Sequence, residues 1–108
     1  MKIWLDDERP APEGFIHHRS SEEMIRFLRK VAHYDTVLGV DSNFEEFSLD
    51  HDLGGDDTGM RVIAYLTDTA TWPKMLTIHT MNPVARDNMI RAVNAEAPEW
   101  VDIYVIYR

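Results

Sequence analysis

The sequence predicts an α/β domain built on a parallel sheet of about four to five strands, with helices on both faces of the sheet. Short apolar runs alternate with amphipathic segments along the chain, as expected when strands and helices follow one another in turn. Clusters of aspartate and histidine come directly after three of the apolar runs. The 108 residues suffice for one hydrophobic core and not for two ordinary domains, so we expect residues 1–108 to form a single domain.

The first part of the chain predicts a strand followed by a helix. Residues 2–5, KIWL, are strand formers that stop at a pair of aspartates, and two prolines then place a loop. Ser20 or Ser21 can cap the next helix. Its apolar positions recur at helical spacing: Met24, Ile25, Leu28, Val31 and Ala32. Residues 34–43 fit either a strand or an irregular insertion.

The second part predicts strands that alternate with helices. Residues 45–50, 75–79 and 101–107 each predict a strand, and the first two end on Asp50 and His79. Thr58 is the expected cap of a helix that runs to about residue 70. Its buried stripe should comprise Met60, Ile63, Ala64 and Leu66. Asn82, followed by a proline, predicts the start of the last helix, whose residues Met89, Ile90 and Val93 should face the core.

Composition narrows the range of partners and chemistries. Eleven lysines and arginines against nineteen aspartates and glutamates give a net charge of −8, which argues against a broad binding surface for duplex nucleic acid. The absence of cysteine excludes disulfides, thiolate zinc sites and cysteine nucleophiles. No apolar run approaches the roughly 20 residues of a membrane span, so we expect a soluble, cytoplasmic protein.

The polar clusters fall at the ends of three predicted strands, which is the edge where an open parallel sheet binds its ligands. The residues at these ends are Asp6 and Asp7, then Asp50, His51 and Asp52, and finally His79. Carboxylates brought together repel one another, and a hard divalent cation such as magnesium is a natural partner for them. Arg9 offers an alternative as an internal counter-charge.

A second group of residues suits an anionic ligand. Free N–H groups at the start of a helix attract anions, and Asn82 and Arg86 can add side-chain donors, although Asn82 is also explained as a cap alone. His51 and His79 are candidates for proton transfer because imidazole titrates near neutrality. The remaining histidines, His17, His18 and His33, are expected at the surface.

These residues resemble those of a response-regulator receiver domain. Receivers carry an acidic pair after the first strand, here Asp6 and Asp7, which helps to hold magnesium, and a later aspartate, here Asp50, which accepts a phosphoryl group. A receiver also has a small hydroxyl residue at the end of its fourth strand, where this sequence has His79 followed by Thr80. It further has a lysine after the last strand and a final helix, which this sequence lacks, so a phosphoryl-acceptor role is disfavoured.

The segments WLDDERP, SLDHDLGGDDTG and IHTMNPVARDNM are similar to those of the cyclic-phosphate processing receiver-like family. This offshoot of the receivers occurs in bacteria and phages, and a role on cyclic phosphates in RNA repair or nucleotide metabolism has been proposed for it. The resemblance implies a receiver-like (flavodoxin-like) fold that is shortened, with the receiver's second strand and helix lost or reduced. It implies Mg or Mn held by Asp6, Asp7, Asp50 and Asp52, an acid/base pair of His51 and His79, and phosphate binding by Thr80, Asn82 and Arg86.

The leading hypothesis is a metal-assisted phosphoesterase that opens a cyclic phosphate on an RNA end or on a nucleotide-derived metabolite. Its expected partner is therefore a nucleotide or RNA-end phosphate. The alternative is a non-catalytic receiver-like module that binds a nucleotide or a protein through the same acidic edge. The two differ in outcome, because the binding module predicts saturable binding without product.

Overall fold

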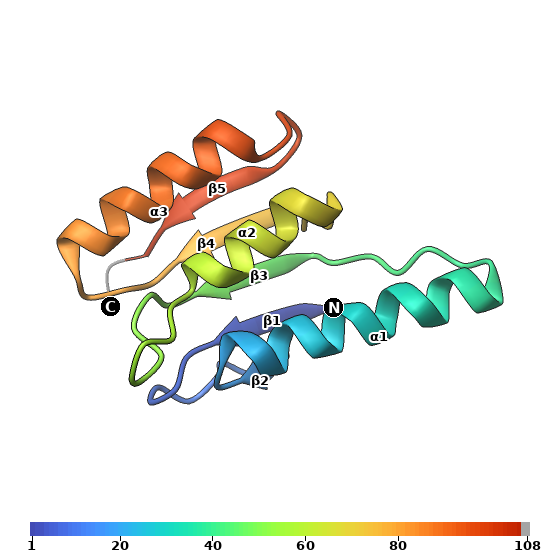
Figure 1. The fold of residues 1–108 in the computed structure, drawn as a ribbon, viewed down its shortest axis with the longest axis horizontal. Helices are drawn as coiled ribbons and strands as arrows, with labels where there is room; N and C mark the ends of the chain where they lie inside the picture. Colours follow the sequence, from blue (N-terminus) through green and yellow to red (C-terminus); the bar gives the residue numbers. More distant parts are fainter. Residues whose placement is uncertain (107–108) are drawn as a thin grey trace.

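The computed structural model describes residues 1–106 and shows a five-stranded parallel sheet with three helices (Figure 1). The strands are β1 (Lys2–Leu5), β2 (Ile16–His18), β3 (Glu46–Leu49), β4 (Met75–Ile78) and β5 (Asp102–Val105). The helices are α1 (Ser21–Leu38), α2 (Met60–Thr69) and α3 (Pro83–Glu96). The sheet order is β2-β1-β3-β4-β5, and every neighbouring pair is parallel. The predicted receiver-like α/β fold is confirmed.

The helices cover one face of the sheet, whereas the sequence predicted helices on both (Figure 1). Helix α2 packs between α1 and α3. The reason lies in the direction of the connections. From β2 through β5 every helical crossover moves across the sheet in the same direction, and right-handed crossovers in one direction place their helices on one face. Only the step from β1 to β2 runs the other way, and residues 6–15 make it without a helix.

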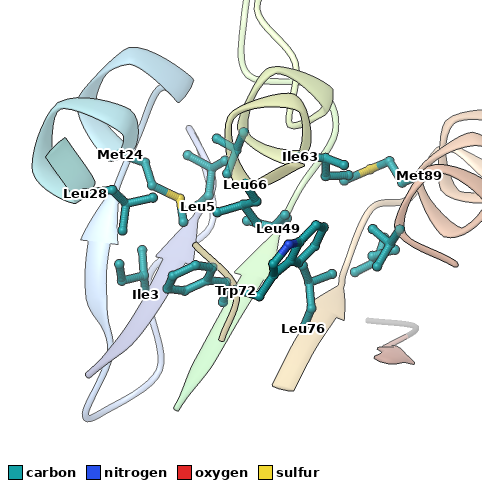
Figure 2. Close-up of a cluster of buried hydrophobic side chains, with 14 of the residues drawn as sticks. Ile3, Leu5, Met24, Leu28, Leu49, Ile63, Leu66, Trp72, Leu76 and Met89 are labelled. Atoms are coloured by element: carbon teal, nitrogen blue, oxygen red, sulfur yellow. The ribbon is translucent and has the colours of Figure 1, made fainter. Parts of the chain in front are cut away.

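The hydrophobic core lies between the sheet and the three helices (Figure 2). Alternate strand residues point toward the helices. The fully buried strand residues on this side are Ile3, Leu5, Phe47, Leu49, Leu76 and Ile78, and they pack against Met24, Leu28, Leu66 and Met89 of the helices. The intervening residues Trp4, Ser48 and Thr77 point to the other side of the sheet. We call that side the open face.

Helix α1 resolves the stretch that the sequence left ambiguous. The Ser20 side chain accepts a hydrogen bond from the Glu23 N–H, and the helix continues to Leu38 before Gly39 ends it with φ 65°. Neither a strand nor an irregular insertion therefore describes residues 34–38, which are helical. The receiver's second strand survives as the three residues of β2, and within the described residues no helix lies between β1 and β2.

The start of α2 differs from the prediction. Its N-cap is Gly59, with no side-chain cap, while Thr58 forms an isolated bridge with Asp52. Glycine is required there because a Cβ would overlap the backbone carbonyl oxygen of Asp50. The buried stripe of α2 contains Val62, and Ala64 is exposed, so that part of the predicted stripe was wrong.

The start of α3 follows the prediction, with the Asn82 side chain capping at the Ala85 N–H and Pro83 as the first helical residue. The last strand ends at Val105, and Tyr107, which the sequence placed in it, lies outside the described residues. None of the helices within residues 1–106 is long and apolar enough to cross a membrane.

Candidate functional site

The ends of β1, β3 and β4 meet at one pocket of about 350 Å³. The expected convergence of three strand ends is therefore present. The pocket is lined by Asp6, Asp7, Glu8, Arg9, Asp50, Asp52, Gly54, Thr80 and Met81. Five of these nine residues carry carboxylic acids and one is cationic. We call this cavity the acidic pocket.

Asp6 is the most constrained carboxylate of the acidic pocket. It is 1% exposed, and its Oδ1 accepts hydrogen bonds of 2.9 Å from the backbone N–H groups of Glu8 and Arg9. Its Oδ2 lies 3.0 Å from Nε2 of His79. His17 supports the same residue from the neighbouring strand, because its Nε2 donates to the Asp6 carbonyl oxygen at 2.8 Å. Asp6 is thus fixed by the turn that follows β1 and by a buried imidazole.

His79 lies beneath the acidic pocket and is not one of its lining residues. Its side chain is fully buried, and its Nδ1 is hydrogen-bonded to Oγ of Ser48 at 2.8 Å. The indole of Trp4 stacks on its ring with a centroid distance of 3.8 Å and an angle of 6° between the planes. The Arg9 guanidinium donates to the His79 carbonyl oxygen at 3.4 Å. Both ring nitrogens and one ring face of His79 are therefore held by the protein.

Asp50 carries the clearest electrostatic signature of the site. Burial, and to a smaller extent the negative charges of Asp6 and Asp52, raise the pKa of Asp50 to about 6. Hydrogen bonds from the His51 N–H and the Thr80 hydroxyl act in the opposite direction, because they stabilise the carboxylate. The rise therefore reflects mainly the burial of the Asp50 carboxylate, with the neighbouring acids adding to it.

The crowded carboxylates fit a divalent cation. Asp6, Asp50 and His79 each offer one ligand atom, and these atoms all lie within 4.8 Å of one another. Neighbouring ligands around an octahedral magnesium ion lie about 3 Å apart, so only small movements are needed to bind one. Carboxylate oxygens suit both magnesium and manganese. Asp7 and Asp52 line the pocket outside this cluster.

Of the three residues expected to bind phosphate, only Thr80 lines the acidic pocket. Thr80 lines it, is 3% exposed, and accepts a hydrogen bond from the Asn82 N–H. Asn82 uses its side-chain oxygen to cap α3, and Arg86 lies one turn into that helix. Neither Asn82 nor Arg86 is a lining residue, although Met81, directly before the helix, is one.

His51 is likewise placed behind a lining residue. Its Nδ1 lies 2.8 Å from Oδ1 of Asp52, and about a fifth of its side chain is exposed (19%). Each histidine expected to transfer protons is therefore bonded to a carboxylate that lines the acidic pocket, His79 to Asp6 and His51 to Asp52.

The sequence missed two residues that support the site, Trp4 and Ser48, which contact the His79 ring. A signal was present, because each precedes a predicted site aspartate by two positions and so shares its side of the strand. The expectation that His18 lies at the surface was wrong. It is 7% exposed, it bonds Glu23 through Nδ1, and its ring packs against Phe27.

One comparison with known proteins identifies a family. The sequence model of a family described as the cyclic-phosphate processing receiver domain matches residues 1–95. That range runs from β1 into α3 and includes every residue that lines the acidic pocket. No curated protein and no solved structure matches the chain. Because the match covers most of the sequence, the chain belongs to the family of cyclic-phosphate processing receiver domains.

Proposed function

We propose that this protein is a metal-dependent phosphoesterase that opens a cyclic phosphate on an RNA end or on a nucleotide-derived metabolite. The observation that carries the proposal is the charge of the acidic pocket, where five carboxylic side chains face one arginine. A phosphate dianion or diester is repelled from such a pocket unless a cation lies between them. The family link to cyclic-phosphate processing supplies the class of substrate.

The cation is a magnesium or manganese ion held by Asp6 and Asp50, while His79 stays bonded to Asp6. When bound, it supplies Lewis-acid polarisation of the phosphoryl oxygens. The raised pKa of Asp50 supports this assignment. Burial makes the ionised carboxylate unfavourable, and a neighbouring cation would stabilise that ionised form.

The chain contributes its own groups for the phosphate. The Arg9 guanidinium lines the acidic pocket and can donate to phosphoryl oxygens, and the Thr80 hydroxyl can do so when it turns from Asp50 to the phosphate. Met81 lines it as well and leads into α3, so the positive end of that helix, with Asn82 and Arg86, lies next to the phosphate. These donors orient the cyclic ester.

Proton transfer runs through the two carboxylate–histidine pairs. Water attacks phosphorus, one P–O bond of the cyclic ester breaks, the attacking water loses a proton, and the freed ribose oxygen gains one. One pair, Asp6 with His79 or Asp52 with His51, takes the first proton, and the other pair gives the second. The histidines act through the carboxylates because these line the pocket and the imidazoles do not.

The test is turnover of 2′,3′-cyclic AMP and of an RNA oligonucleotide with a 2′,3′-cyclic phosphate end, in MgCl2 or MnCl2 and in EDTA. The expected product is the phosphomonoester, formed only with metal. Asp50→Asn should abolish turnover, while the matched control Asp68→Asn, at an exposed position on α2, should leave it unchanged. Absence of turnover of both substrates with either metal would contradict the proposal.

A second candidate function is a binding module without catalysis. It is favoured by the burial of His79, whose ring nitrogens are both occupied by protein groups. The same cyclic nucleotide then binds saturably in the presence of metal, and no phosphomonoester accumulates. Isothermal titration beside the turnover assay separates the two candidates.

A further inference from the structure

A second cavity, of about 520 Å³, lies on the open face of the sheet and has no part in the proposed chemistry. This size is typical of a small-molecule site. Its walls include the aromatic rings of Trp4, Phe15 and Tyr104 and the polar side chains of Glu46, Ser48 and Thr77. We call it the open-face groove. It exists because no helix of the described chain covers this side of the sheet.

The open-face groove is adjacent to the acidic pocket. Ser48 lines the groove and Asp50 lines the pocket, and both lie on the same side of one extended segment, about 7 Å apart along the chain. Trp4 on β1 and Asp6, the residue that follows this strand, repeat the relation. Trp4, which lines the groove, stacks on His79, and His79 is bonded to Asp6 of the acidic pocket. A ribose ring spans a step of this order, and the attached base then extends along β3 from Ser48 toward Glu46.

The chemistry of the groove suits an uncharged aromatic ring that carries N–H donors. The Thr77 hydroxyl donates to Oε2 of Glu46 at 3.1 Å, which leaves acceptor capacity on a carboxylate that is only partly buried. Tyr104 is 52% exposed, so its ring offers a face for stacking. A second phosphate is disfavoured because Glu46 would repel it.

We propose that the open-face groove holds the base of a nucleoside whose cyclic phosphate lies in the acidic pocket. This inference rests on the proposed function and names its substrate class: nucleoside 2′,3′-cyclic phosphates, not small cyclic phosphates that lack a base. Tyr104 stacks on the base, and Glu46 accepts from an amino or imino group at its edge.

Direct binding tests the groove without reference to turnover. Guanosine and adenosine, which carry no phosphate, are titrated into the ¹⁵N-labelled protein, and the amide signals of Phe15, Thr77 and Tyr104 should shift. Tyr104→Ala should weaken binding by about tenfold through lost stacking, and Glu46→Gln should weaken guanosine binding by about the same factor through lost charge-assisted hydrogen bonds. Tyr34→Ala, on exposed α1 surface, and Glu45→Gln are the matched controls, and both should bind as the wild type does.

Turnover of two substrates separates failure of this inference from failure of the proposed function. Guanosine 2′,3′-cyclic phosphate should have a kcat/KM at least about tenfold above that of glycerol 1,2-cyclic phosphate, which has no base. Equal kcat/KM values for the two substrates would overturn the inference about the groove and leave the proposed phosphoesterase activity intact. Nucleosides that shift no amide signal of the groove would do the same. If neither substrate turns over, the proposed phosphoesterase activity is refuted. The nucleoside titration alone then decides whether the groove binds a base. A groove covered by a second copy of the chain also gives no nucleoside shift, and sedimentation of wild type and Tyr104→Ala would then differ.

Discussion

Replacing Asp50 with asparagine should stabilise the metal-free protein at pH 7.5. The pKa of Asp50 rises from its ordinary value of 3.8 to about 6 in the folded chain, chiefly because of burial. That difference corresponds to about 3 kcal/mol when the group is ionised in both states. Asp50 is only half-buried, and solvent screening reduces the figure to about 1 to 2 kcal/mol. Asparagine keeps the side-chain oxygen that accepts from the His51 N–H, so the local structure should persist.

The gain should depend on pH in a defined direction. Because the folded-state pKa lies above the unfolded one, the folded protein binds the extra proton between about pH 4 and 6. The wild type therefore loses stability as the pH rises through this range, and the loss is complete above it. The advantage of Asp50→Asn is then full at pH 7.5 and falls to about a third of that at pH 4.5.

The assay is thermal and urea unfolding of wild type, Asp50→Asn and the control Asp68→Asn in EDTA at both pH values. A gain of 1 to 2 kcal/mol raises the melting temperature by about 5 to 10 °C for a domain of this size. An equal gain at both pH values would refute the electrostatic explanation. No gain at pH 7.5 would show that Asp50 is not strained by its surroundings.

Three further outcomes are expected. Millimolar MgCl2 or MnCl2 should raise the melting temperature of the wild type and not that of Asp6→Asn, because a ligand of the folded state alone stabilises it; equal rises would exclude the site. Gly59→Ala should cost about 1 to 3 kcal/mol in urea unfolding, since its Cβ overlaps the Asp50 carbonyl oxygen, and a neutral result would contradict that contact. Ser20→Ala should cost about 1 kcal/mol in urea unfolding through the lost cap, and unchanged stability would contradict that role.

The sites at the strand ends were predictable because the carboxyl ends of parallel strands share one edge whatever the order of the strands. Asp6, Asp50 and Thr80 needed only a correct strand boundary to be placed at the acidic pocket. The burial of His79 was harder to foresee. It depends on Ser48 and Trp4, which come from two other strands and contact its ring only once the sheet has formed.

The layering of the fold could not be read from the sequence in the same way. Which face a helix covers depends on the direction of each crossover, and that direction depends on the order of strands far apart in the chain. Strand β2 has three residues, too few for a period of two to appear, and it exists because it pairs with β1. The end of α1 is similar, because a β-branched Thr36 and Val37 weaken the helical pattern while Gly39 marks its true end.

A sheet with helices on one side has a thermodynamic consequence. The strands bury their core side behind three helices, while no helix covers the open face within the described residues. Unfolding therefore exposes less apolar surface per residue than it does in a domain of equal length with both sheet faces covered by helices. Heat-capacity change and denaturant m-value both scale with that surface, so both should be small for this chain. Its stability should then vary little with temperature, with a broad, shallow maximum.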